Sequence, residues 1–462
     1  MASFAKASVI TGASILIKIL IGLVVAKLMA IEFGPEGIGL TGNYRQLLTV
    51  LGVLAGAGIF NGVTKYIAEY DKVNDIFARK RLIGTASSFV LFFSCTLALV
   101  FLCYAPQISL FLFFDKGYAN IIRILAVLQF SIAYNNLILA ILKGYRDALS
   151  NGLSIIIGAI LALIGFLVLQ IYADFNGALI GLALLPATAL LPSLFFIKKH
   201  HGLSIAIFIP AWDSLIAKNL SKFTVMTLIT AVTMPLAYYL LRGHIAAYYG
   251  YTSQSIFLKI LHQLTAKPTE LYEVLQAFQT PLVKNIALFQ VGIWQAMSMI
   301  SDAYLQFITA AFTVYLLPTL SRIDDDKKLI KTVFYYLLLI LLLVSCLSGI
   351  VWLLKDFVIW LLFSKDFNSM RSLFTWQLIG DVFKVASYVV GFLIISKAKL
   401  GYYLLAELSQ FILLITLSYV AINKLGVEGA SIAYMLTYMT YFSLCLFALS
   451  IWYIKISKKI AI

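Results

Sequence analysis

The chain is 462 residues long, 62% hydrophobic and 12% charged, and its formal net charge is +15. A soluble domain carries about 25% charged residues, so this composition, with a mean hydropathy of +0.97, excludes an ordinary soluble protein and indicates one that lies in lipid. The positive charge does not indicate nucleic-acid binding, because the cations are spread over short loops and the sequence shows no basic soluble domain.

Twelve apolar stretches are each long enough to cross a bilayer as a helix, which takes roughly 20 residues. The first begins near the N-terminus and is too long for the apolar core of a cleavable signal, so we interpret it as a transmembrane helix that stays on the protein. We therefore expect an all-α membrane protein. The predicted spans are 8–30, 43–68, 82–104, 121–142, 152–172, 177–197, 223–245, 292–318, 333–354, 374–396, 401–422 and 430–454.

Basic connections alternate with acidic or nearly neutral ones along these predicted spans. The connections around Glu36 and Asp174 carry acidic residues, whereas the basic clusters all fall on the opposite side of the membrane if twelve spans are right. The positive-inside rule then places both termini in the cytoplasm. The basic clusters include Lys80, Lys199, Lys328 and Lys397.

A weak internal repeat divides the chain into two halves. For example, Gln129 in the fourth span corresponds to Gln377 in the tenth. The repeat predicts two six-helix lobes, 1–210 and 211–462, and secondary transporters place their site between such repeats. Residues 251–289 interrupt the symmetry, and we expect them to form an unusual insertion on the outer side.

Three lysines, Lys18, Lys65 and Lys384, lie inside apolar spans. A cation at the centre of such a span costs roughly 2.5–3.5 kcal/mol on insertion scales, so it usually faces a protein interior or a water-filled cavity. These lysines predict a polar cavity suited to an anionic substrate. The other predicted substrate-binding residues, on polar faces or nearer span ends, are Arg45, Asn61, Arg123 and Lys143.

A second interpretation is open for several of these cations. Arg45 and Arg123, with Lys27 and Arg242, lie nearer span ends, where long side chains reach the headgroups. Lys143 is equally consistent with a residue that only determines topology.

Four carboxylates are candidates for a proton-coupled step. Asp302 shares its helix stripe only with uncharged polar residues. Asp381 lies near Lys384, and Glu69 lies four residues after Lys65, so each acid is also consistent with a structural role that neutralises its lysine. The fourth candidate is Glu407.

The sequence does not indicate an enzyme. It has no P-loop lysine motif, no H-E-x-x-H and no nucleophile elbow. Gly37-Ile38-Gly39-Leu40-Thr41-Gly42 matches G-x-G-x-x-G, but it lies between membrane spans and lacks the preceding strand of a dinucleotide site. The four cysteines are not paired at metal or redox spacing. We expect no catalytic residue, no cofactor and no metal.

Several stretches resemble the polysaccharide-lipid flippases of the multidrug/oligosaccharidyl-lipid/polysaccharide (MOP) superfamily. The similarity covers nearly the whole chain and departs at residues 251–289. The stretches are Phe33-Gly34-Pro35-Glu36-Gly37-Ile38-Gly39, Asn43-Tyr44-Arg45-Gln46-Leu47, residues 51–66, Ser301-Asp302-Ala303-Tyr304-Leu305-Gln306-Phe307 and Ala406-Glu407-Leu408-Ser409-Gln410-Phe411.

The resemblance implies two six-helix lobes around a cationic central cavity. It also implies transport of an undecaprenyl-diphosphate-linked oligosaccharide, that of enterobacterial common antigen, from the inner to the outer leaflet of the bacterial inner membrane. The implied partners are the lipid-linked oligosaccharide, membrane lipid and other polysaccharide-assembly membrane proteins, with no nucleic acid. We expect alternating access. The alternatives are an ion-coupled antiporter of a small drug or metabolite, since one fold serves many substrates, and a membrane scaffold that needs no polar stripes.

Overall fold

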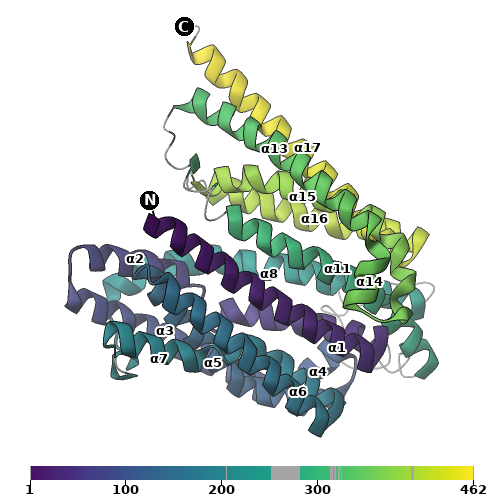
Figure 1. The fold of residues 1–462 in the computed structure, drawn as a ribbon, viewed down its shortest axis with the longest axis horizontal. Coiled ribbons are helices and arrows are strands. Elements are labelled where there is room, and N and C mark those ends of the chain that lie inside the picture. Colours follow the sequence, from purple (N-terminus) through teal and green to yellow (C-terminus); the bar gives the residue numbers. More distant parts are fainter. Residues whose placement is uncertain are drawn as a thin grey trace, which may run out of the picture. The chain divides into compact units, whose positions relative to one another are not determined.

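The computed structural model describes residues 2–203, 205–250, 281–312, 316, 319–320, 323, 325–396 and 400–460. All regular elements within these ranges are helices, and no strand occurs among them (Figure 1). Eight helical stretches of the described chain are long and apolar enough to cross a membrane. The prediction of an all-α membrane protein is confirmed, and its physical reason is that a helix pairs its own backbone groups in lipid.

The first half of the chain consists of long helices that are broken at a few defined residues. In α1, Gly34 adopts a φ of +60° and is followed by Pro35, which separates the first predicted span from the second. The second predicted span, 43–68, is not one helix, because α1 ends at Leu54 and α2 begins at Phe60. In α6, Ala173 and Asp174 break the helix between the fifth predicted span and the sixth. The elements are α1 (Ala2–Leu54), α2 (Phe60–Lys72), α3 (Ile76–Cys103), α4 (Ala105–Phe113), η1 (Lys116–Tyr118), α5 (Ala119–Gly144), α6 (Ala148–Ala187), α7 (Leu190–His201) and η2 (Ile205–Phe208).

The second half contains the helices that carry the later predicted spans. They are α8 (Ser214–Gly250), α11 (Pro281–Ala311), α13 (Asp326–Leu353), α14 (Lys355–Leu362), η5 (Lys365–Met370), α15 (Arg371–Ser396), α16 (Leu400–Leu425) and α17 (Val427–Ile460). Helix α11, which carries the eighth predicted span, begins at Pro281, earlier than predicted. Residues 281–289, which were predicted to belong to the insertion, are therefore the first turns of this helix. The rest of the predicted insertion, residues 251–280, lies outside the described residues. The count of twelve spans stays a prediction.

The chain divides into two compact units. Unit 1 contains residues 1–25 and 43–235, and unit 2 contains residues 26–42 and 236–462. The unit boundaries fall inside α1 and α8, and the one in α8 directly follows Pro235. The predicted lobes, 1–210 and 211–462, stay a prediction.

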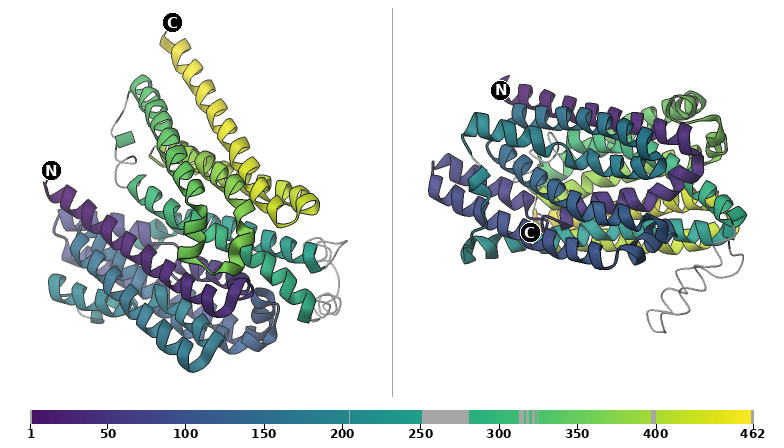
Figure 2. Two further views of the ribbon diagram at one scale, coloured as in Figure 1. Left: turned by 45° about the vertical axis from the view of Figure 1, so that its right-hand side comes forward. Right: turned by 90° about the horizontal axis from the view of Figure 1, so that it is seen from below.

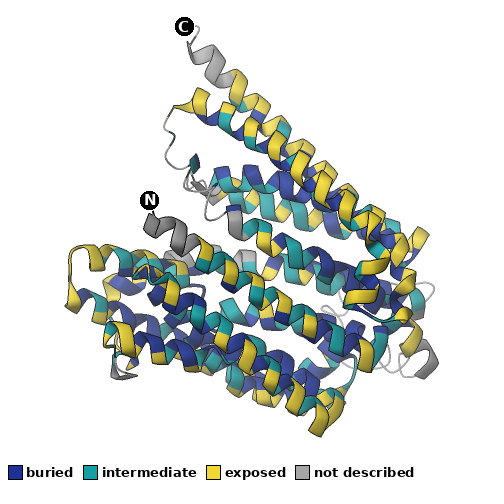
Figure 3. Ribbon diagram, in the orientation of Figure 1, coloured by how far each residue is buried: buried dark blue, intermediate teal, exposed yellow. Residues whose placement is uncertain are grey.

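Each unit has its own apolar core. In unit 1, α2, α3 and α5 bury side chains such as Val63, Ile83 and Leu137. In unit 2, α13, α15 and α17 run alongside one another in all the ribbon views (Figure 2) and bury side chains such as Val333 and Val389. The outer faces of α13 and α17 are exposed (Figure 3) and apolar, which is typical of helix faces that contact lipid.

The glycine-rich run that follows Gly34 has a packing role in unit 2. A Cβ at Gly39 would lie 2.3 Å from the carbonyl oxygen of Leu288, and a Cβ at Gly292 would lie 1.8 Å from the carbonyl oxygen of Pro35. Both positions therefore require glycine, because α1 and α11 approach here at backbone distance.

Candidate functional site

Two of the predicted lysines come together in unit 1. Lys18 on α1 and Lys143 at the end of α5 are both exposed, and the charge of Lys143 acts on Lys18. Among the described residues, neither lysine has an acidic partner within ion-pair distance. Two neighbouring cations repel each other, so an anion bound between them would be stabilised by both.

The short helix α2 presents a polar face beside these lysines. Asn61, Lys65 and Glu69 are exposed, whereas Val63 and Ile67 on the other face are buried. The Lys65 Nζ lies 3.8 Å from the Glu69 Oε1, and both side chains are more than half exposed. An exposed i,i+4 pair of this kind contributes about 0.3–0.5 kcal/mol, so the pairing leaves Lys65 free to exchange Glu69 for another anion.

The crossing of α2 and α5 places Lys65 near Lys143. The Thr64 hydroxyl, next to Lys65, donates to the carbonyl oxygen of Ala140 at 3.0 Å. One turn later on α5, a Cβ at Gly144 would lie 2.6 Å from the Ile67 side chain. The structure therefore gathers Lys18, Lys65 and Lys143 in one part of unit 1.

The two arginines of the predicted set have different environments. Arg45 is half-buried, and its Nε and Nη2 have no hydrogen-bond partner within the described part of the chain. Buried donors without partners are costly, so this guanidinium is suited to an anionic ligand. Arg123 is exposed, donates to the Asn120 Oδ1 at 2.6 Å, and lies roughly 30 Å along α5 from Lys143 at 1.5 Å per residue. The structure does not bring Arg123 to that lysine.

In unit 2, Asp381 is the centre of a buried hydrogen-bond cluster. Its carboxylate accepts from the Ser301 hydroxyl at 2.7 Å and from the Tyr434 hydroxyl at 2.6 Å, and it also accepts from the Tyr304 hydroxyl. These donors come from α11 and α17, while Asp381 is on α15. We call Asp381, Ser301, Tyr304, Tyr434 and Lys384 the Asp381 cluster. A buried polar network with all its partners in place makes the packing of its helices rigid and specific.

Lys384 is held in this cluster by aromatic rings. It is buried, and its Nζ lies 5.1 Å from the ring centroid of Tyr434 and 5.0 Å from that of Tyr438. These distances are those of cation–π interactions. Tyr434 thus contacts both charged groups, its hydroxyl on Asp381 and its ring on Lys384, and the predicted binding lysine is enclosed rather than open.

Asp302 and Glu407, the other predicted coupling residues in unit 2, are half-buried. The cations that act on Asp302 come from neighbouring helices, Lys384 on α15 and Arg242 on α8. Glu407 accepts a hydrogen bond from Tyr403. The sequence places no cation beside Asp302 on its own helix, but the structure brings cations to it from two other helices.

Two of the cations near span ends do not reach the headgroups. Arg242 is buried in unit 2, its Nε donates to the Gln295 Oε1 at 2.8 Å, and its guanidinium lies 5.5 Å from the Trp294 ring. The Lys27 Nζ donates to the carbonyl oxygens of Trp360, at 2.7 Å, and Phe363. The interpretation of these two side chains as snorkelling to headgroups is wrong, because protein groups hold their charged ends.

The described residues include no group of three or more histidine, cysteine, aspartate or glutamate side chains that could hold a metal ion.

The fold is similar to that of solved transporters. An inward-facing multidrug resistance MATE family transporter of the MOP superfamily matches with a TM-score of 0.72, 14% identity and coverage of 96% of this chain and 98% of that chain. An outward-facing MATE family transporter matches with a TM-score of 0.63, 14% identity and coverage of 99% and 96%. The chain thus has the fold of these MATE family transporters.

Sequence comparison gives the particular family, although no family model matches the chain. A lipid III flippase from Escherichia coli (strain K12) is 46% identical over 451 residues, which cover 97% of this chain and 99% of that protein. A lipid III flippase from Shigella flexneri matches with the same identity and coverage. The chain belongs to the lipid III flippase family.

Proposed function

We propose that this protein moves lipid III, an undecaprenyl-diphosphate-linked oligosaccharide, from the inner to the outer leaflet of the bacterial inner membrane. The observation that carries the proposal is the 46% identity over 97% of the chain to a relative named as a lipid III flippase. The exposed lysines of unit 1 support it, because a diphosphate is bound well by charge-assisted hydrogen bonds. No covalent chemistry is needed, so the protein acts as a transporter and not as an enzyme.

In the proposed binding mode, Lys18, Lys65, Lys143 and Arg45 bind the diphosphate. Asn61 supplies polar contacts to the sugars, while the prenyl tail stays in lipid. Arg123, near the other end of α5, is proposed to contact the headgroup at a later stage of its passage. Lys384 can contact substrate only if the Asp381 cluster opens during the cycle, because tyrosine rings enclose it.

Transport requires inward-open and outward-open states that both bind the headgroup. The proposed proton-coupling residues are Asp302, Asp381, Glu69 and Glu407. Among them we favour Asp302, because the Asp381 carboxylate is occupied by three hydroxyl donors. Lys384 and Arg242 act on Asp302 and favour its charged form, so proton loading there requires that these cations move away from it. Both termini are proposed to lie in the cytoplasm, on the side of the exposed basic residues around Lys80.

The experiment is complementation of bacteria that lack their own lipid III flippase, with measurement of the lipid-linked oligosaccharide in each leaflet. The wild-type chain should restore lipid III to the outer leaflet. A matched control is Lys424→Gln, which removes an exposed lysine from the end of α16, outside the proposed site. Export of a small drug without restoration of lipid III would overturn the proposal in favour of an antiporter.

A further inference from the structure

The connection between α7 and α8, together with the first residues of α8, exposes large apolar side chains. Within residues 209–215, here called the anchor segment, Ile209 is 65% exposed, Trp212 is 65% exposed and Leu215 is 70% exposed. A short connection in water ordinarily keeps such side chains inside. Three large apolar side chains exposed within seven residues form a patch of the kind that marks a contact with a membrane or another protein.

The anchor segment is fixed to α3 by its backbone. The Ala211 N–H donates to the carbonyl oxygen of Gly84 at 3.2 Å, and the Ser88 hydroxyl donates to the carbonyl oxygen of Ala211 at 2.8 Å. A Cβ at Gly84 would lie 2.8 Å from the Ala211 Cβ, so the contact depends on glycine. The segment is therefore held in place along α3.

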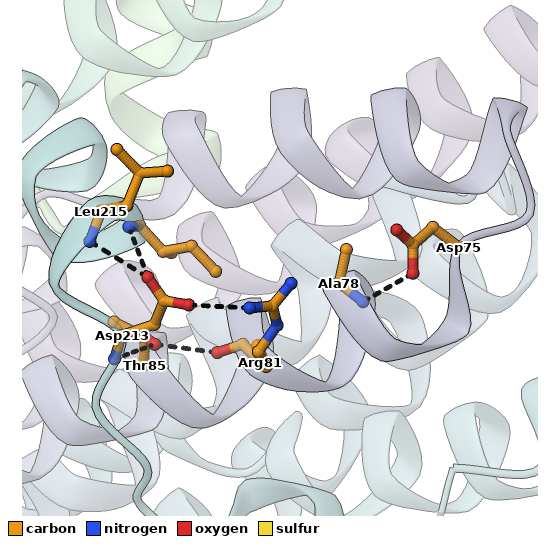
Figure 4. Close-up of polar contacts among 7 residues, drawn as sticks. Asp75, Ala78, Arg81, Thr85, Asp213 and Leu215 are labelled. Carbon is orange, nitrogen blue, oxygen red and sulfur yellow. Dashed lines mark hydrogen bonds and ion pairs between the residues drawn. The ribbon is translucent and has the colours of Figure 1, made fainter.

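Asp213 fastens the C-terminal end of the anchor segment (Figure 4). Its carboxylate accepts from the backbone N–H of Leu215 at 3.0 Å and lies 3.3 Å from the Arg81 Nη1, and its own N–H donates to the Thr85 hydroxyl at 3.3 Å. These bonds pair the polar groups of Asp213 and of the neighbouring backbone with protein partners. The outer surface of the segment therefore consists mainly of apolar side chains.

These contacts place Trp212 against α3, a few turns past the basic run at the start of that helix. Its ring stacks on Phe89, with centroids 5.5 Å apart, and Phe89 lies roughly 12 Å along α3 from Arg81 at 1.5 Å per residue. Arg81 ends the basic run that precedes the third span, and tryptophan is enriched at this boundary between headgroups and acyl chains. Lys80 and Lys218 are exposed beside the segment, and each cation near an anionic lipid surface contributes about 1 kcal/mol.

We propose that the anchor segment binds the surface of the lipid leaflet, with Ile209, Trp212 and Leu215 among the upper acyl chains and Lys80 and Lys218 on anionic headgroups. The basic residues identify the occupant as lipid with anionic headgroups. On the proposed topology, this is the cytoplasmic leaflet. The inference goes beyond transport, because it concerns how the connection between the two halves of the chain is held.

The test uses the full chain, without its native cysteines, in nanodiscs of phosphatidylcholine with or without phosphatidylglycerol. A bimane label at Trp212→Cys should be quenched by brominated acyl chains several-fold more than a label at Phe77→Cys, and less by aqueous iodide. Phe77 is a matched control, since it is 80% exposed on α3 but precedes the basic run. Phosphatidylglycerol should increase the quenching by brominated acyl chains at position 212. A double variant that combines Lys80→Gln and Lys218→Gln should lose that increase.

Equal access of iodide to positions 212 and 77 in lipid alone would overturn the proposal and favour a protein partner on this surface. Quenching that does not respond to phosphatidylglycerol would overturn the headgroup contact. If the cysteine variants fail to fold, brominated-lipid quenching of native tryptophan fluorescence, compared between wild type and Trp212→Phe, measures the same contact. The nanodiscs measure no transport, so failure here is distinct from failure of the proposed function.

Discussion

Lys18 in unit 1 and Lys384 in unit 2 have the same sequence signature but opposite surroundings. Lys18 and Lys143 are exposed and have no acidic partner among the described residues. Lys384 is buried against Tyr434 and Tyr438, one turn from an aspartate that accepts three hydroxyl donors. An intramembrane lysine can therefore serve either to bind an anion or to complete a polar core.

The difference depends on what neighbouring helices supply. In unit 2, α11 and α17 bring hydroxyl groups and aromatic faces to the charged residues of α15, which keeps buried charges compensated. In unit 1, the neighbouring helix brings Lys18 a second lysine. We infer that the charges of unit 2 mainly hold its helices together, whereas those of unit 1 remain available to a ligand, and the following predictions test this contrast.

The largest expected effect is loss of stability from Asp381→Ala. The variant removes one of the two carboxylates that interact with Lys384 and leaves three hydroxyl groups without their acceptor. Breaking a buried charged network in this way costs about 3–5 kcal/mol. Thermal unfolding of the purified protein in detergent measures it. Asp381→Asn, which keeps the shape and can still accept hydrogen bonds, should cost clearly less. Equal stability of Asp381→Ala and wild type would remove the structural role assigned to the cluster.

The next effect concerns transport. Lys18→Gln and Lys143→Gln should each lower the rate of lipid III flipping by roughly ten- to a hundred-fold, since a hydrogen bond to a charged group contributes about 1.5–3 kcal/mol. Thermal unfolding should hardly change, because both side chains are exposed. Arginine at either position should restore part of the rate. Normal flipping by the double glutamine variant would show that these cations do not bind the diphosphate.

A smaller effect is expected at Asp147, an acid of unit 1 that has several hydrogen-bond partners. It caps α6 by accepting from the Ser150 N–H at 3.0 Å, and it accepts from the His201 Nε2 at 3.0 Å. Burial alone would raise the pKa of Asp147, but the hydrogen bonds from Ser150 and His201 hold it below its usual value. Asp147→Ala should therefore cost about 0.5–2 kcal/mol as a lost helix cap.

The pH dependence of that stabilisation has a defined sign. Because the folded-state pKa of Asp147 is lowered, its contribution is full above the unfolded pKa, about 3.9, and is lost as pH falls through the folded pKa. The stability difference between wild type and Asp147→Asn, from unfolding curves at several pH values, should be constant near neutrality and shrink only in the acid range. A difference that changes sharply between pH 6 and 8 would point to the histidines instead.

The smallest effect is expected from Glu69→Gln. It removes the exposed ion pair in which the Lys65 Nζ lies 3.8 Å from the Glu69 Oε1. The free energy of unfolding should therefore change by about 0.5 kcal/mol or less. Flipping should continue, with substrate affinity equal to or slightly above that of wild type, because Lys65 loses a competing anion. A variant that flips normally but no longer responds to an imposed pH gradient would instead identify Glu69 as the coupling acid.

The fold was largely predictable, because apolar runs in lipid leave few alternatives to helices, and Gly34-Pro35 marks a break by its own backbone chemistry. The environment of each charge was not predictable. Lys18 and Lys384 are both single cations in apolar sequence, and only the packing of α17 against α15 shows that Tyr434 encloses one of them. The sequence did not predict the tyrosines that surround the charged residues of α15, which are Tyr304, Tyr434 and Tyr438. In an apolar span, a tyrosine of a polar cluster cannot be distinguished from an aromatic residue of the core. The burial of Arg242 was not predicted for a related reason, because its partner Gln295 lies on another helix.

Helix α8 contains a proline, and this has a mechanical consequence. The start of α8 is fastened to α3 through Asp213, so a movement of the rest of α8 must be taken up as bending within the helix. A regular helix resists bending, but proline removes one backbone hydrogen bond and crowds the preceding turn. Pro235 is therefore where we expect α8 to bend most easily, and the stiffness of that turn would set the work that bending this helix requires.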